Sequence, residues 1–227
     1  MWISMCGRYT LLADELEILR EFGLEQEIES YETSYNIAPG QNVLAIIHDG
    51  DKKRAGYLRW GLVPSWAKDK KIGYKMINAR SETAHKKPSF KLLMSRKRCL
   101  IVADSFYEWQ KKEKGKQPKR IQLTDRKLFA FAGLWDKWEQ EDEQLFTCTI
   151  LTKEANTFME DIHHRMPIIL PKSKQDQWIK PGRMQPVEAS QFLQAVGDEE
   201  LAAYNVESYV NAAKHNDEQC IAPLVDA

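Results

Sequence analysis

The apolar residues of this 227-residue chain fall into short runs of strand length separated by turn signals, and this spacing constrains the fold more than any other feature. Short runs rich in branched and aromatic side chains, bounded by Gly, Pro, Asn and Asp, are typical of strands. We expect strands at residues 43–48, 55–62, 99–103, 120–123, 128–134, 145–151 and 168–170. Because strands at hairpin spacing pair antiparallel, the sequence predicts an α+β fold around a curled, barrel-like, mainly antiparallel sheet with peripheral helices.

The sequence also predicts short helices. Asp14 lies three residues before Glu17 and ahead of an apolar stretch that Gly23 ends, which is the pattern of a capping box and a glycine stop. Residues 81–94 indicate a helix that is interrupted or restarts at Pro88. Further helices are expected at 154–160, 174–179 and 188–196.

Length and composition fit one globular unit. A chain of 227 residues with 43% hydrophobic and 29% charged residues can bury one good core and is short for two. We therefore expect a single domain over 5–227, with residues 1–4 as an extension or leader, and a monomer. No apolar stretch approaches the roughly 18 to 20 residues that a membrane span needs. A cytoplasmic protein without membrane contact is the expectation.

The cysteines exclude some classes of site. They lie far apart, at positions 6, 99, 148 and 220, without a Cys-x-x-Cys pair. This spacing favours neither a disulfide framework nor a zinc site. The chain also lacks a phosphate-binding glycine loop and a dinucleotide fingerprint. We expect free thiols, no metal and no cofactor.

Charge is segregated along the chain although the formal net charge is zero. Residues 14–32 contain eight Asp and Glu against Arg20 alone, whereas residues 68–127 contain nineteen Lys and Arg against six Asp and Glu. A basic stretch interleaved with aromatic residues is a candidate contact for a phosphate backbone. A solvated surface is the alternative, and it is the common explanation of charge runs.

Cys6 is the first candidate for chemistry. A lone cysteine is usually a small buried hydrophobic residue. Its place after Met5 suggests another use, because removal of everything through Met5 leaves an α-amine and a thiol on adjacent carbons. An α-amine has an ordinary pKa of about 7.7 to 8.0, so a useful fraction is nucleophilic at neutral pH. Such an amine adds to an aldehyde to give an imine, and the thiolate then closes a thiazolidine ring.

Three polar residues are candidates for proton transfer or positioning around this cysteine. Glu108 lies among aromatic residues at the end of the apolar strand 99–103, where desolvation raises a carboxyl pKa; an edge carboxylate paired with a lysine is the alternative. His163 is a candidate general base, although a lone histidine is more often structural. Asn78 is either a hydrogen-bond partner of substrate or of the Cys6 amine, or a turn residue that satisfies local backbone.

Arginine and tryptophan residues are candidates for nucleic-acid contacts. Arg80 and Arg165 suit bidentate phosphate contacts. A simple surface charge is an equal alternative for each. Bases of single-stranded DNA stack on aromatic faces, for which Trp60, Trp66 and Trp109 are candidates. Core packing is the default for Trp60, whereas Trp66 follows a proline loop and precedes Lys68.

Six short motifs in order make the chain resemble the SOS response-associated peptidase (SRAP) family, from residue 5 to about 179. Each motif alone is weak, but the ordered set is specific. They are Cys-Gly-Arg-Tyr at 6–9, Tyr-Asn-Ile-Ala-Pro-Gly at 35–40, Trp-Gly-Leu-Val-Pro-Ser-Trp at 60–66, Ile-Asn-Ala-Arg-Ser-Glu-Thr at 77–83, Phe-Tyr-Glu-Trp at 106–109 and Ile-His-His-Arg-Met-Pro at 162–167. The resemblance implies a single α+β domain with a basic channel for single-stranded DNA, and a terminal cysteine that forms a thiazolidine crosslink with abasic sites. It also implies cleavage of the peptide bond before that cysteine, often a strand-nicking lyase activity, and association with the nucleoid when DNA is bound.

The resemblance implies a role for each matching residue. Cys6 is the nucleophile and crosslinking residue, Asn78 positions it, Glu108 shuttles protons, and His163 is the general base. His164 is secondary, because the family pattern varies there. The implied DNA contacts are Arg8, Asn36, Pro39, Arg80 and Arg165, with Trp66 and Trp109 stacking on bases or wedging between them.

One departure from the family pattern is plain, since the pattern begins Met-Cys and this chain has Met1-Trp2-Ile3-Ser4 before it. Either translation starts at Met5, or self-cleavage removes residues 1–5; we favour processing. Two other functions stay open. One is a cysteine peptidase or amidohydrolase acting in trans, and the other is a non-covalent single-strand binding module.

Overall fold

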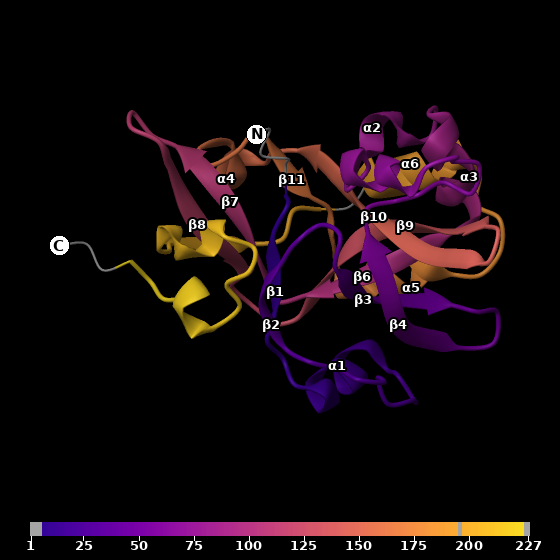
Figure 1. The fold of residues 1–227 in the computed structure, drawn as a ribbon, viewed down its shortest axis with the longest axis horizontal. Helices are drawn as coiled ribbons and strands as arrows, with labels where there is room; N and C mark the ends of the chain where they lie inside the picture. Colours follow the sequence, from indigo (N-terminus) through magenta and orange to yellow (C-terminus); the bar gives the residue numbers. More distant parts are fainter. Residues whose placement is uncertain (1–5, 195–196, 225–227) are drawn as a thin grey trace.

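The structure, a computed structural model, describes residues 6–194 and 197–224, and it contains two β-sheets with helices around them (Figure 1). Residues 1–5, which include the proposed extension, lie outside the described residues. The first sheet is entirely antiparallel. Its five strands have the spatial order β13 (Leu201–Asn205), β8 (Lys116–Leu123), β7 (Ser105–Lys111), β1 (Tyr9–Leu11) and β2 (Ser34–Ile37).

The second sheet closes on itself. Its strands follow the path β11 (Arg165–Pro167), β10 (Glu143–Glu154), β4 (Lys53–Trp60), β3 (Asn42–His48), β6 (Arg98–Ala103), β9 (Phe129–Gln140) and β12 (Ile169–Leu170). Because β9 also pairs with β10, the strands β10, β4, β3, β6 and β9 form a ring. The short β5 (Asn78–Arg80) adds to β10, and only the pairings of β10 with β4 and β5 are parallel. A closed ring leaves few unpaired strand edges.

One apolar core joins the ring to the first sheet. Inward-facing residues of the ring, such as Ile46, Leu100 and Phe131, belong to the same cluster as Tyr9 and Phe106 of the first sheet. Tyr9 and Phe106 each meet Phe131 edge to face, the favourable geometry for aromatic rings. The α+β fold around a curled, mainly antiparallel sheet is confirmed.

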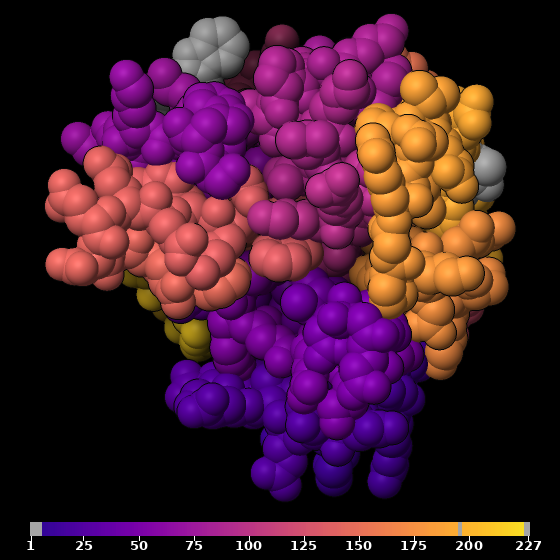
Figure 2. All heavy atoms as spheres, turned by 90° about the vertical axis from the view of Figure 1, so that its right-hand side faces the viewer, coloured from indigo at the N-terminus to yellow at the C-terminus, as the bar shows by residue number. Residues whose placement is uncertain are grey.

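The helices lie at the periphery, as the sequence predicts. α1 (Glu15–Phe22) begins with the Asp14 and Glu17 capping box and ends at Gly23, whose φ of 60° suits glycine. The helical stretch after residue 81 splits into α2 (Ser81–Ala84) and α3 (Pro88–Arg96). Three more follow, which are α4 (Thr157–Glu160), α5 (Lys172–Ile179) and α6 (Pro186–Gln194). α3 and α6 pack side by side at one end of the molecule (Figure 2). No described helix is long and apolar enough to cross a membrane.

Glu108 lies elsewhere than the sequence predicts. It is not at the end of the buried strand 99–103, because the chain turns at Asp104 and enters β7, which belongs to the other sheet. The apolar run gives no sign of this change of sheet, since both strands are buried.

Several short elements escape sequence prediction altogether. β1, β2, β5 and β13 have three to five residues each, too few for a clear period. The C-terminal part also forms two 3-10 turns, η2 (Ser208–Asn211) and η3 (Glu218–Cys220). Pairing with distant strands, rather than local propensity, specifies these elements.

Candidate active site

Cys6 lies in the turn that leads into β1, with only 3% of its surface exposed. Its backbone φ is 44°, in the left-handed region that favours glycine. Holding another residue there costs about 1 to 3 kcal/mol, and such strain concentrates at functional sites. The angle φ is the torsion about the N–Cα bond, and its first atom is the carbonyl carbon of the preceding residue, so cleavage before Cys6 would remove this constraint.

Glu108 reaches Cys6 from the neighbouring strand. β1 and β7 run antiparallel with Tyr9 opposite Phe106, so the residues before Tyr9 run alongside those after Phe106. Side chains alternate along a strand, and Phe106 and Glu108 share the face that carries the main core. The backbone N–H of Cys6 donates to Oε1 of Glu108 at 2.6 Å. A carboxyl group therefore contacts the nitrogen of the peptide bond that processing would break.

Burial determines the protonation of this pair. It raises the pKa of Glu108 from 4.5 to about 7, and the hydrogen bonds from Cys6 offset only part of that increase. Burial also raises the pKa of the Cys6 thiol, and the nearby Glu108 raises it further, whereas the charge of Arg165 lowers it. At neutral pH the thiol is thus protonated, and Glu108 is the group that can give or take a proton.

His163 lies on the loop between α4 and β11, beside the same face of β7. Gln110, two residues beyond Glu108, donates from Nε2 to the carbonyl of Asp161 at 2.8 Å and holds this loop. Burial lowers the pKa of His163, so its imidazole is neutral at physiological pH. Its Nδ1 lies 3.1 Å from both the backbone N and O of Arg165. Nδ1 is thus engaged with the backbone of Arg165, whereas Nε2 makes no hydrogen bond to that backbone.

Asn78 and Arg165 lie on the two strands that flank β10. Asn78 in β5 is opposite Ile150, and Arg165 in β11 is opposite Glu154. The Arg165 guanidinium is buried and donates to both carboxylate oxygens of Glu82, at 2.7 and 2.9 Å. A bidentate pair of this kind fixes the guanidinium plane, and the charge of Arg165 lowers the pKa of the Cys6 thiol.

Comparison with known proteins decides the family. Residues 5–213 match the family model described as SOS response associated peptidase (SRAP). The chain belongs to this family.

Individual relatives agree with the SRAP assignment. The abasic site processing protein YoqW of Bacillus subtilis is 49% identical over 221 residues, which cover 96% of this chain and 99% of YoqW. The abasic site processing protein HMCES of Gallus gallus is 33% identical, covering 86% of this chain and 67% of HMCES. A crystal structure of a protein from Bacteroides thetaiotaomicron matches with a TM-score of 0.86, over 97% of this chain and 100% of that one. At 24% identity, this last likeness supports the fold alone.

Three more predicted DNA contacts from the SRAP motifs are at least partly exposed. Trp66 is 59% exposed and lines a groove with Leu92 and Arg96 of α3. Arg80 is exposed and shares a cavity wall with His164 and Arg165. Pro39 is half-buried in the loop after β2. Their roles as DNA contacts stay predictions.

Arg8, Asn36 and Trp109 form a separate group that contacts the C-terminal part of the chain. Arg8 donates to the carbonyls of Val210 and Asn211, and Trp109 donates to the side chain of Asn211. Asn36 is only 1% exposed, and its amide is used within the protein. This burial differs from the exposed position that a direct DNA contact requires. Sequence reasoning assigned no role to residues 206–224, because carbonyl and amide contacts leave no periodic signal.

No metal site accompanies these residues. Among residues 6–194 and 197–224, no three His, Cys, Asp or Glu side chains gather as metal ligands. We assign none of the residues above to a metal or a cofactor.

Proposed function

We propose that this protein processes abasic sites in single-stranded DNA and that Cys6 forms a covalent thiazolidine bond with the damaged sugar. The contact between the Cys6 nitrogen and the Glu108 carboxyl carries the proposal. Relatives at 49% and 33% identity are named abasic site processing proteins, which supports DNA with abasic sites as the substrate. Membership of a peptidase family supports a peptide-cleaving step.

The first step is release of the Cys6 amine. The thiol of Cys6 adds to the carbonyl carbon of the preceding residue, its proton passes to Glu108, and Glu108 returns a proton to the departing nitrogen. The C–N bond breaks as the C–S bond forms. Water then hydrolyses the thioester, releasing the leader as a carboxylate and restoring the thiol. A carboxyl with a pKa of about 7 can act in both directions at neutral pH.

The second step is capture of the abasic sugar. The open form of that sugar has an aldehyde, to which the free amine adds with loss of one water to give an imine. The thiol then adds across the imine carbon and closes the five-membered ring, while its proton moves to the nitrogen. Neutral His163 and Glu108 supply the proton transfers that ring opening and imine formation need. Removal of a sugar proton from the imine instead eliminates the 3′ phosphate, which is the nicking side reaction.

DNA binding is assigned to the surface around this centre. Arg8, Arg80, Trp66 and Trp109 offer the cations and aromatic faces that single strands bind. We assign the half-buried Pro39, from the motif at 35–40, to the same surface. Asn36 and Arg165 act instead through protein contacts that fix the surface. We also propose that this processing unit is the single domain 5–227 and that it acts as a monomer.

The decisive experiment is the intact mass of the purified protein before and after incubation with an oligonucleotide that carries one abasic site. We expect loss of residues 1–5 and a heat-stable adduct, both absent from Cys6→Ala. Cys148→Ala, which removes another buried thiol, is the matched control and should retain the adduct.

Other outcomes would replace the proposal. An unprocessed chain that hydrolyses added peptides indicates a peptidase acting in trans. An unprocessed chain that binds the oligonucleotide without an adduct, with equal affinity in Cys6→Ala, indicates a non-covalent binding module.

A further inference from the structure

The C-terminal segment, defined as residues 206–224, covers the side of β7 that faces away from Glu108. Tyr107 and Trp109 point to this side and form a small apolar cluster with Val206, Val210 and Cys220. In Figure 1 the segment is the yellow part of the chain, next to β7 and β8. The family match ends at residue 213, so most of the segment lies beyond it.

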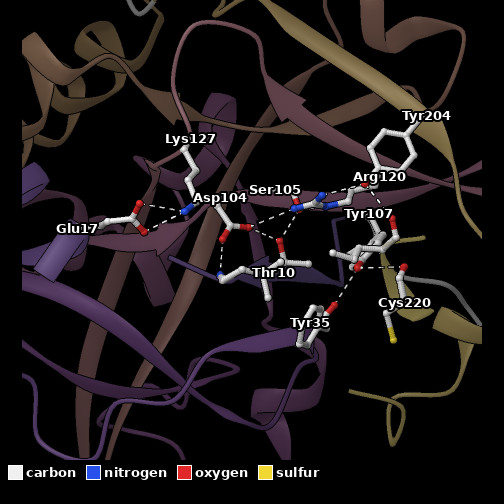
Figure 3. A network of polar contacts seen from close by, with 12 residues as sticks. Thr10, Glu17, Tyr35, Asp104, Ser105, Tyr107, Arg120, Lys127, Tyr204 and Cys220 are labelled. Atoms are coloured by element: carbon white, nitrogen blue, oxygen red, sulfur yellow. Dashed lines mark hydrogen bonds and ion pairs between the residues drawn. The ribbon is translucent and has the colours of Figure 1, made fainter. Parts of the chain in front are cut away.

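Buried polar groups hold the segment in place. Nδ2 of Asn36 lies within hydrogen-bond distance of the carbonyls of Val210, Ala212 and His215, at 3.2, 3.2 and 2.8 Å. The hydroxyl of Tyr107 lies between the carbonyls of Tyr35 and Cys220, at 2.8 and 3.3 Å (Figure 3). Bonds to a buried amide and a buried hydroxyl are costly to lose, so the segment is a fixed part of the fold.

Among the described residues, the hydrogen-bond partners of Arg8 are neutral atoms. Its Nη1 donates to Oδ1 of Asn36 at 2.9 Å and to the carbonyl of Val210 at 2.7 Å, and its Nη2 donates to the carbonyl of Asn211 at 3.0 Å. Burial lowers the pKa of Arg8, which still remains a cation. Within the part of the chain that the structure describes, no carboxylate forms an ion pair with it. Its charge is therefore oriented but not neutralised, which suits an anionic ligand.

Asn211 also fixes the indole of Trp109. The Nε1–H of Trp109 donates to Oδ1 of Asn211 at 2.7 Å, and the Arg8 guanidinium carbon lies 5.9 Å from the ring centroid. The bond holds the ring by its edge. One residue thus touches both groups, since its backbone oxygen binds Arg8 and its side-chain oxygen binds Trp109.

We propose that Asn211 is a positioning residue for single-stranded DNA, which presents the Trp109 ring to a base and the Arg8 cation to the adjacent phosphate. This inference rests on the proposed function and extends its DNA surface to the C-terminal segment. Arg8 lies two residues from Cys6, and Trp109 directly follows Glu108. A nucleotide held by this pair therefore has its place in the strand fixed relative to the reacting groups. Asn211 itself touches no reacting atom, so it governs affinity rather than bond formation.

The experiment compares Asn211→Ala with Tyr204→Phe. Tyr204 donates to the carbonyl of Ile221 at 2.9 Å, so its variant loosens the same segment without touching Arg8 or Trp109. Affinity for an oligonucleotide without an abasic site is measured by fluorescence anisotropy, and the crosslinking rate is measured at saturating abasic oligonucleotide. We expect Asn211→Ala to bind about tenfold more weakly, in the range of one base-stacking contact. The crosslinking rate of Asn211→Ala at saturation should stay within about twofold of wild type, which is the scatter of such measurements. The affinity of Tyr204→Phe for the ordinary oligonucleotide should stay within the same limit.

A double-mutant cycle tests the route through the indole. Trp109→Phe keeps a ring but lacks the N–H, so the loss from Asn211→Ala should largely vanish in that background. Equal weakening by Asn211→Ala and Tyr204→Phe, unchanged affinity of Asn211→Ala, or additive effects with Trp109→Phe would each overturn the inference.

This result is separable from the proposed function. A wild-type protein that binds the ordinary oligonucleotide but forms no adduct contradicts the thiazolidine chemistry and leaves the affinity comparison valid. A wild-type protein without measurable affinity for the ordinary oligonucleotide overturns the role of Asn211.

Discussion

Two buried carboxyl groups four residues apart, Asp104 and Glu108, lie in opposite environments. Asp104 accepts hydrogen bonds from the Thr10 hydroxyl and the Leu12 backbone, and the Arg120 guanidinium lies 3.7 Å from it (Figure 3). Glu108 has the Cys6 nitrogen at 2.6 Å, and no Lys or Arg forms an ion pair with it among the described residues. Burial in this setting raises the pKa of Glu108 to about 7.

These environments indicate a structural role for Asp104 and a chemical role for Glu108. Asp104 ties β1 to β7 and, through Arg120 and Tyr204, to the C-terminal strand. Glu108 contributes less to that framework. Its pKa of about 7 instead lets it exchange a proton at neutral pH, as a general acid or base must. If this distinction is correct, equivalent amide substitutions at the two positions should affect different properties of the protein.

The largest expected effect is on the rate of crosslinking. Glu108→Gln keeps the side-chain shape but removes the proton, so we expect the single-turnover rate with abasic oligonucleotide to fall about 100-fold or more. Wild type should also show a change of rate near pH 7 that the variant lacks. The single-turnover rate is measured by quenching reactions at several pH values between about 5.5 and 8.5, roughly the range in which proteins are most stable. A variant with the wild-type rate and profile would remove Glu108 from the mechanism.

The next effect is on stability. Asp104→Asn leaves Arg120 without its buried anion and removes an acceptor, so the free energy of unfolding should fall by about 3 kcal/mol. Urea denaturation gives this value. The exposed pair of Glu17 and Lys127 is the control, since solvent screens it and Glu17→Gln should cost much less than Asp104→Asn. A loss at Asp104 no larger than at Glu17 would contradict the structural role of the network.

Glu108 should also show a pH-dependent cost to folding. Between pH 4.5 and about 7 the unfolded chain releases this proton while the folded protein keeps it, so stability falls as pH rises through that window. Glu108→Gln cannot ionise. The variant should match wild type near pH 4.5 and exceed it by about 3 kcal/mol at pH 8. Urea denaturation at both pH values gives the comparison, and an equal difference at both would place Glu108 in a solvated setting.

The smallest effect concerns the other face of β7. Arg8→Gln removes one cation that we assign to the DNA phosphates, so the slope of log K against log salt should become shallower by about 0.7. Anisotropy titrations at several salt concentrations measure the slope. Lys127→Gln removes an exposed cation that already pairs with Glu17, on the loop between β8 and β9, and should leave the slope unchanged. An unchanged slope in Arg8→Gln would show that the phosphates bind elsewhere.

Local signals explain what could be predicted. The α1 caps and the restart at Pro88 are properties of neighbouring residues, and the structure has both. The position of Glu108 could not be deduced in the same way, because a change of sheet at Asp104 depends on which strands it meets. Its residue type and aromatic neighbours were enough to select it.

The sequence alone determined the family, the candidate residues and the strand-rich fold, because motifs, caps and periodicity are local in the chain. Tertiary structure decided which of those residues meet. It placed Cys6 against Glu108, 102 residues apart, and joined Arg8 and Trp109 to Asn211. It also decided that Asn36 is buried. Contacts of this kind depend on strand register and on backbone carbonyls, which every residue carries and which therefore leave no mark in the sequence.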